Sequence, residues 1–290
     1  MMSSATATRE LEVLYELHGP SDTRSLSPEL SNKYGGDLTL GDPVVYGNMV
    51  ATIDGIAAER TRPHSSRDIS GGDPSDRFVM GLLRAHADAV VIGAGTLRAH
   101  PKGAWTAEAA YPGAGPAFTA LRHAEGRAER PTLVVLSTSG NVPAHPALHG
   151  AIVLTSERGV ARLSDEATEH ADVRVVPTLD RGLDVSTAID AVRARGHSRI
   201  LTEGGPRLIG SLIDAGAIED LFLTVSPLIA GRAAAGTRPG IVDGLELQPG
   251  GFAEATLRSV RRSGSLLLLR YGLSEGSGNV HGTRGRERSR

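Results

Sequence analysis

Short apolar runs alternate along most of this chain with segments whose apolar residues recur at helical spacing. Asp73, followed by Pro74, is typical of a helix start, and residues 157–170 are expected to be helical. Asp184 is expected to cap another helix, which Gly196 ends. The apolar runs, rich in Val, Ile and Leu, are expected to be buried strands. They cover residues 44–53, 89–92, 133–136, 152–155, 173–176, 200–202, 221–226 and 266–270.

This order of strands and helices predicts a single α/β domain over residues 42–273. Its central sheet is expected to be mostly parallel, with helices on both faces. The last two strands lack a clear helix between them and are expected to add an antiparallel edge. Residues 1–41 are expected to form an N-terminal extension, with a short helix over 11–17. The polar, Arg-rich residues 274–290 are expected to be a disordered tail.

Composition narrows the possible functions. The 290 residues carry a net charge of −2, and only 3% are aromatic, so no basic stripe with interleaved aromatics predicts nucleic-acid binding. The absence of cysteine excludes disulfides and Cys-ligated zinc. The ten histidines are scattered, and the pair His145 and His149 spans a proline in a loop, so no metal site is expected. Without a signal peptide or an apolar stretch of membrane-spanning length, we expect a cytoplasmic protein with no membrane partner.

Small, amide-rich turns follow three of the expected strands. They are Gly93-Ala94-Gly95-Thr96, Ser137-Thr138-Ser139-Gly140 and Glu203-Gly204-Gly205-Pro206. Ligands of open α/β sheets bind beyond the carboxyl ends of the strands. Glycines let a phosphate approach the backbone, and the first turn of a helix offers free N–H groups to an anion.

These turns favour a pyrophosphate site, although each one alone is also compatible with an ordinary tight turn. A complete G-x-G-x-x-G fingerprint is absent, because Arg98 stands where the third glycine would be. Asp54 lies after the first inner strand, where its carboxylate is equally compatible with a turn and with binding or proton transfer.

Four segments in this order resemble the reductase domain of the bacterial riboflavin-pathway enzyme RibD, most closely its stand-alone actinobacterial relatives. They are N-M-V-A-T-I-D-G (48–55), D-R-F-V-M-G-L-L-R-A (76–85), A-D-A-V-V-I-G-A-G-T-L-R (87–98) and R-I-L-T-E-G-G-P-R-L-I-G (199–210). The resemblance covers roughly residues 42–272 and implies a dihydrofolate-reductase-like, three-layer α/β/α fold.

The resemblance also implies an activity. Members use NADPH to reduce a 5-amino-6-ribosylaminouracil 5′-phosphate to the ribityl form, with hydride transfer to C1 of the sugar, and they usually form homodimers. The family pattern implies that Asp54 and Glu203 act in catalysis and contact the substrate together with Arg84. Arg98 and the Ser137–Thr138 turn are our own candidates for the 2′-phosphate, because a charge-assisted bond there distinguishes NADPH from NADH. All expected cofactor-binding residues are Ala51, Thr52, Gly93, Thr96, Arg98, Ser137, Thr138, Gly204, Gly205, Pro206 and Leu208.

Two departures from the family pattern leave other functions open. Residues 97–101 lack the acidic pair that RibD often has there, and without cysteine the chain has no zinc deaminase domain. One alternative is an NADPH-dependent reductase of dihydrofolate, a pteridine or another imine on the same fold. The other is an NADP(H)-binding protein without turnover, because fold does not determine function.

Overall fold

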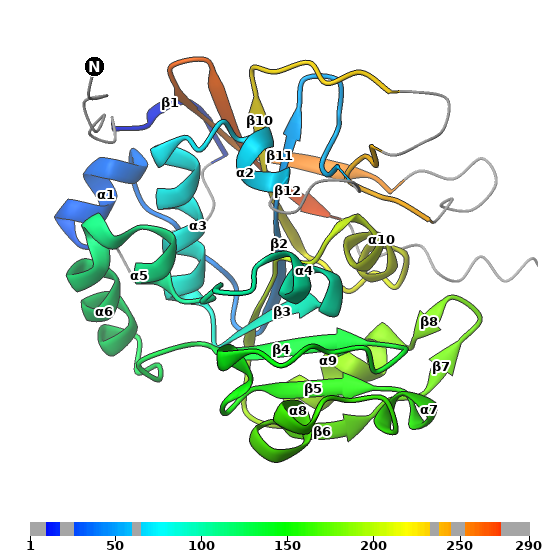
Figure 1. Cartoon of the computed structure of the whole chain (residues 1–290). Coiled ribbons are helices and arrows are strands. Elements are labelled where there is room, and N and C mark those ends of the chain that lie inside the picture. The colour runs from blue at the N-terminus through cyan, green and yellow to red at the C-terminus, as the bar shows by residue number, and fades with distance from the viewer. Residues whose placement is uncertain (1–9, 18–25, 60–64, 233–237, 245–252, 274–290) are drawn as a thin grey trace, which may run out of the picture.

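The computed structural model describes residues 10–17, 26–59, 65–232, 238–244 and 253–273. A ten-stranded sheet crosses the molecule in the order β1-β11-β12-β10-β2-β9-β3-β4-β5-β6 (Figure 1). A short hairpin of two two-residue strands, β7 (Thr178–Leu179) and β8 (Gly182–Leu183), stands apart from it. The strands of the large sheet are β1 (Glu12–Glu16), β2 (Val44–Thr52), β3 (Ala89–Gly93), β4 (Thr132–Ser137), β5 (Ile152–Thr155), β6 (Asp172–Val175), β9 (Arg199–Thr202), β10 (Asp220–Ser226), β11 (Ala255–Ser263) and β12 (Leu266–Leu273).

The sheet has a parallel part and an antiparallel edge. The strands from β10 through β2, β9, β3, β4 and β5 to β6 all pair in parallel. On the other side of β10, strands β12, β11 and β1 pair antiparallel. The predicted α/β sheet with an antiparallel edge is therefore confirmed, and every strand expected from an apolar run is present.

The helix expected over residues 11–17 was wrong, because this segment forms β1. Four of its apolar residues alternate at every second position, which favours a strand, and so short a helix is marginal without tertiary support. Pairing with β11 supplies backbone hydrogen bonds instead, and Val13 and Tyr15 favour a strand. Strand β11 was not expected, because its sequence is polar and contains several arginines.

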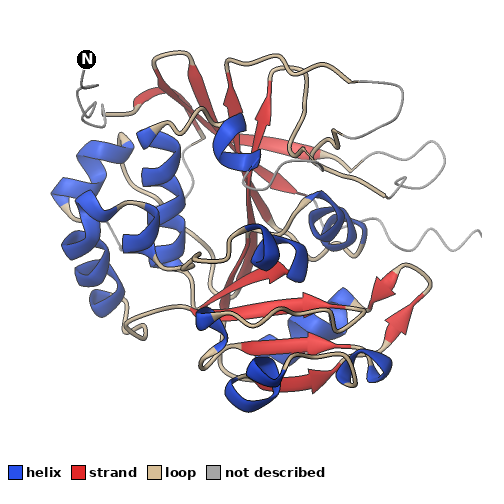
Figure 2. Ribbon diagram, in the orientation of Figure 1, coloured by secondary structure: helices blue, strands red, loops and turns tan. Residues whose placement is uncertain are grey.

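Helices cover both faces of the sheet (Figure 2). One core contains side chains of α1, α3, α4, α5, α6 and α8, and the other contains side chains of α9 and α10. The helix expected over 157–170 is interrupted and forms α7 and α8. The α-helices are α1 (Pro28–Tyr34), α2 (Ser65–Ile69), α3 (Pro74–His86), α4 (Ala94–Ala99), α5 (Ala107–Ala110), α6 (Gly115–Ala124), α7 (Glu157–Val160), α8 (Asp165–His170), α9 (Val185–Arg193) and α10 (Pro206–Asp214), and the 3-10 helices are η1 (Pro112–Ala114) and η2 (Pro146–Leu148).

Capping residues define the helices that position the site. Asp73 accepts a hydrogen bond from the Ser75 N–H at the start of α3, and Pro74 occupies the first turn, as expected. Asp184 caps α9 in the same way. No helix in the described part of the chain is long and apolar enough to cross a membrane.

The described part of the expected N-terminal extension packs as part of the domain. Leu11, Leu30 and Tyr34 are buried in the same core as α3 and α6. Residues 274–290, expected to be a disordered tail, lie outside the described residues.

Candidate active site

The carboxyl ends of β9, β3 and β4 lie side by side, because these strands are neighbours in the parallel part of the sheet. The three amide-rich turns therefore lie at one edge. Helices α4 and α10 begin there at Gly93 and Gly205, and neither has a side-chain cap. In the first turn of the longer helix, α10, Pro206 has no N–H and Leu208 N donates to the carbonyl oxygen of Gly205, so the N–H groups of Gly205 and Arg207 are those offered to an anion.

The physical reason for glycine differs between the positions in these turns. A Cβ on Gly204 would lie 2.6 Å from Leu208 Cδ2, so packing against that side chain requires glycine. A Cβ on Gly93 or Gly205 would meet no atom within 4 Å, and both residues have negative φ. Neither packing nor backbone conformation explains these two glycines. They leave room at the backbone, as a bound pyrophosphate requires.

Two of the remaining candidates near α4, Arg98 and Thr138, link neighbouring loops. Arg98 donates from Nη1 to the carbonyl oxygen of Asn141, at 2.5 Å, and thereby links α4 to the loop after β4. Thr138 is exposed, and its Oγ1 accepts a hydrogen bond from Leu183 N in the β7–β8 hairpin. Thr96 is half-buried in the first turn of α4, whereas Ser137 is buried at the end of β4.

Three other cofactor candidates contribute mainly backbone or packing. Pro206 occupies the first turn of α10, as the sequence predicts. Leu208 packs against the core beneath α9 and α10, and the Ala51 side chain is buried in that core too. Ala51 can therefore contact a ligand at the carboxyl ends of the strands only through its backbone.

Asp54 lies at the same end of the sheet, and its carboxylate accepts three hydrogen bonds from the protein. Its Oδ1 accepts from Thr52 Oγ1 at 2.5 Å and from Ala230 N, and its Oδ2 accepts from Gly231 N at 2.7 Å. The hydrogen bond from Thr52 is the main cause that lowers the pKa of Asp54 to about 2. The exposed carboxylate therefore stays charged and joins the turn after β2 to the loop after β10.

Arg84 and Glu203 form a buried, bidentate ion pair. Arg84 Nε donates to Oε1 at 2.8 Å and Nη2 donates to Oε2 at 2.6 Å. Arg84 Nη1 donates to the carbonyl oxygens of Ala104 and Thr106, so the pair also fixes the loop that follows α4. The structure brings these two predicted residues together, with most of the guanidinium already engaged inside the protein.

A residue that the sequence analysis missed, Asp76, lies two turns before Arg84 on the same face of α3. Its side chain is buried, and this burial is the main cause that raises its pKa to about 6. Hydrogen bonds with Thr224 and Ser70 oppose the shift, whereas the charges of Asp73 and Glu203 add to it. The signal in the sequence was the spacing of Asp76 and Arg84, which places two opposite charges on one face of a buried helix.

The sheet beneath α3 is polar and incompletely covered. Asn48 and Val50 lie on β2, an inner strand, yet both are partly exposed. A small cavity lies against this face, with Asn48, Val79 and Thr224 in its wall. Ser226, at the end of β10, is fully buried, and its Oγ has no hydrogen-bond partner among the described residues. Polar residues at such positions are unfavourable for folding alone and indicate a binding surface.

Comparisons with known proteins agree with this architecture. The chain is 25% identical over 236 residues to the 2,5-diamino-6-ribosylamino-4(3H)-pyrimidinone 5′-phosphate reductase of Methanothermobacter thermautotrophicus, covering 79% of this chain and 97% of the relative. A reductase of the same name from Archaeoglobus fulgidus is 25% identical over 210 residues, 70% of this chain and 87% of the relative.

A solved structure shows the same fold. The pyrimidine reductase-like protein of Corynebacterium diphtheriae superposes with a TM-score of 0.64 at 24% identity, covering 81% of this chain and 93% of that protein. The model of the RibD C-terminal domain matches residues 43–269, which span the parallel sheet, both amide-rich helix starts and the Arg84–Glu203 pair. The chain therefore belongs to the RibD C-terminal domain family.

Proposed function

We propose that this protein is a cytoplasmic, NADPH-dependent reductase of a ribosylaminopyrimidine 5′-phosphate, which it converts to the ribityl form. The observation that carries the proposal is that the Arg84–Glu203 pair lies at the carboxyl end of β9, beside the helix starts at Gly93 and Gly205. Polar side chains for a substrate and backbone N–H groups for a dinucleotide therefore lie at one end of the sheet. The two archaeal relatives, named as reductases of such a phosphate and matched over most of their length, support this choice.

The residues at the edge fit a dinucleotide phosphate. Gly205 and the uncapped start of α10 would hold the pyrophosphate through backbone N–H groups, and Gly93 would leave room for it. Arg98 and the exposed Thr138 hydroxyl would select a 2′-phosphate over a 2′-hydroxyl. A bound NADPH would supply the hydride that reduces C1 of the sugar.

The ribose ring opens to an imine-like species before hydride transfer to C1, and the ring oxygen takes up a proton as it becomes a hydroxyl. Asp54 accepts three hydrogen bonds and keeps further acceptor capacity at its exposed carboxylate, whereas Glu203 is held in the ion pair with Arg84. We assign them to holding substrate hydroxyl and amino groups rather than to donating protons. Asp76, whose pKa is about 6, is a suitable proton source near neutral pH.

The test begins with NADPH binding to the purified full chain, measured by calorimetry with NADH as the control. Oxidation of NADPH is then followed with two ribosylaminopyrimidine 5′-phosphates, one with an amino group and one with an oxo group at C2 of the pyrimidine, and with dihydrofolate. We expect tight binding of NADPH over NADH and turnover of at least one ribosylaminopyrimidine. Turnover of dihydrofolate alone would refute the substrate class, and absence of NADPH binding would refute the cofactor.

A homodimer remains part of the proposal. The strand at the antiparallel edge, β1, has exposed apolar side chains at Val13, Leu14 and Tyr15. Within the described residues β1 is the outermost strand, and an edge strand with exposed apolar side chains is suited to pairing with a second copy of the chain.

A further inference from the structure

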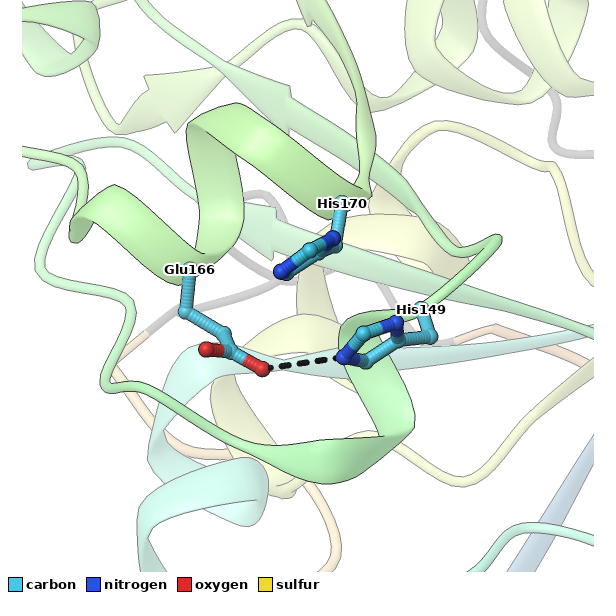
Figure 3. A group of neighbouring side chains, drawn as sticks. All are labelled: His149, Glu166 and His170. Atoms are coloured by element: carbon cyan, nitrogen blue, oxygen red, sulfur yellow. Dashed lines mark ion pairs between the residues drawn. The ribbon is translucent and has the colours of Figure 1, made fainter.

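Two histidines and a glutamate converge on the surface near the amino ends of β5 and β6, whereas the candidate active site lies at the carboxyl ends of the strands. His149 follows η2, just before β5 begins, whereas Glu166 and His170 lie on α8, just before β6 begins. Glu166 and His170 are four residues apart, so they share one face of α8. All three side chains point toward one another (Figure 3), and their potential ligand atoms lie within 4.8 Å of one another.

We propose that His149, Glu166 and His170 form a binding site for a divalent transition-metal ion of the zinc type. Two imidazole nitrogens and one carboxylate are a donor set that Zn²⁺ prefers, with the fourth position left for water. The site is independent of the proposed reductase activity, because it lies at the amino ends of β5 and β6.

The backbones that carry the ligands are fixed, while the ligands themselves can move. Leu148 and Ala167 are fully buried in the core beside His149 and Glu166. The amide of Gly150 donates to the carbonyl oxygen of His170 at 3.0 Å, which ties the two segments directly. In contrast, the side chains of His149, Glu166 and His170 are 59%, 31% and 37% exposed. A metal ion therefore needs to reorient only surface side chains.

The present contacts show what binding must rearrange. Glu166 Oε1 lies 3.2 Å from His149 Nε2, and the two imidazole rings stack with centroids 3.9 Å apart and planes at 19°. Nearly parallel rings cannot both direct a lone pair at one ion, so the stack has to open. A tetrahedral zinc ion needs ligand atoms ~3.3 Å apart, so separations of up to 4.8 Å must shorten by side-chain rotation.

The surrounding charge favours a cation. Glu169, on the same helix, has its Oε2 3.9 Å from His170 Nε2 and is 71% exposed. Asp165 begins the helix and is exposed as well. A divalent ion bound by one carboxylate keeps a positive charge, which these neighbouring carboxylates would stabilise.

The experiment uses the full chain without an affinity tag, treated with chelator and then titrated with Zn²⁺ by calorimetry. Co²⁺ is titrated in parallel, because its visible absorption reports tetrahedral coordination. We expect one ion per chain and a thermal midpoint that rises with Zn²⁺. His149→Ala, His170→Ala and Glu166→Gln should each weaken binding ~10-fold or more.

His123→Ala is the matched control, because His123 is an exposed histidine on α6 away from the cluster. It should leave the affinity for Zn²⁺ unchanged. Glu166→Gln keeps the shape of the side chain and guards against a folding defect, which circular dichroism in chelator would reveal. Equal affinity in the wild type and in the three cluster variants, or no binding by the wild type at micromolar Zn²⁺, would overturn the proposal.

Discussion

Replacing Asp76 with asparagine is expected to stabilise the protein at pH 7.5, and to do so progressively less as the solution is acidified. Burial raises the pKa of Asp76 from 3.8 to about 6 in the folded state. One pKa unit corresponds to about 1.4 kcal/mol, so the ionised carboxylate costs about 3 kcal/mol of folding free energy above pH 6. The asparagine side chain of the variant carries no charge and retains an oxygen that can accept hydrogen bonds from Thr224 and Ser70.

The direction in which stability changes with pH follows from proton binding by Asp76. Between pH 3.8 and about 6 the folded protein binds the Asp76 proton more tightly than the unfolded chain does, so wild-type stability falls as the pH rises through this window. The stabilisation by Asp76→Asn should therefore be near zero below pH 4 and reach its full value, up to about 3 kcal/mol, above pH 7.

Urea denaturation of the wild type and the variant at several pH values between 4 and 8 measures this difference directly. Asp190→Asn is the control, since Asp190 is an exposed carboxylate on α9, and its effect should be small and independent of pH. A stability difference for Asp76→Asn that does not change with pH would refute the argument from burial. If Asp76 also donates the proton during turnover, the variant should lose kcat while it keeps its affinity for NADPH.

Three other predictions concern the same domain. Gly204→Ala should destabilise the fold by about 1–3 kcal/mol, because its Cβ would overlap a packed leucine, whereas Gly205→Ala should leave urea unfolding unchanged and weaken NADPH binding in calorimetry. Glu203→Gln should destabilise the protein by about 3–5 kcal/mol in urea, because it leaves the Arg84 guanidinium buried without its anion, and Arg84→Met with Glu203→Gln should be less harmful than the single change. Leu14→Glu should shift the protein toward monomer in light scattering, and an unchanged mass would exclude β1 from the dimer interface.

The parallel strands could be predicted from the sequence because burial on both faces requires continuous apolar runs. Strand β11 follows a different rule. It pairs on both sides within the antiparallel part, and its inward Arg261 is buried against Tyr34 and forms an ion pair with Glu16. A buried arginine satisfied by distant partners has no local signature. The β1 segment was misread for the same reason, since its pairing with β11 depends on residues far away in the chain.

The amide-rich turns among the candidate site residues could be located from the strand ends, but side-chain partners could not. The family resemblance implied that Arg84 and Glu203 contact one substrate, yet their bidentate pairing depends on how α3 packs against the end of β9. The expectation of no metal site considered only histidine pairs close in sequence. It overlooked that Glu166 and His170 are one helical turn apart, and the approach of His149 follows only from the packing of η2 beside α8.

The polar positions on α3 and on the sheet beneath it all oppose folding, and they are grouped rather than scattered. Asp76 is destabilised by its buried charge, Ser226 lacks a partner for its hydroxyl among the described residues, and Asn48 occupies an inner strand where apolar residues would pack better. Asn48 and Ser226 lie on the sheet face that α3 covers, and Asp76 lies on α3 itself, two turns before Arg84. A ligand that hydrogen-bonds to these groups would offset the folding free energy that these groups cost the unliganded protein. The side chains that lower the stability of the free protein should therefore be those that contribute most to substrate affinity.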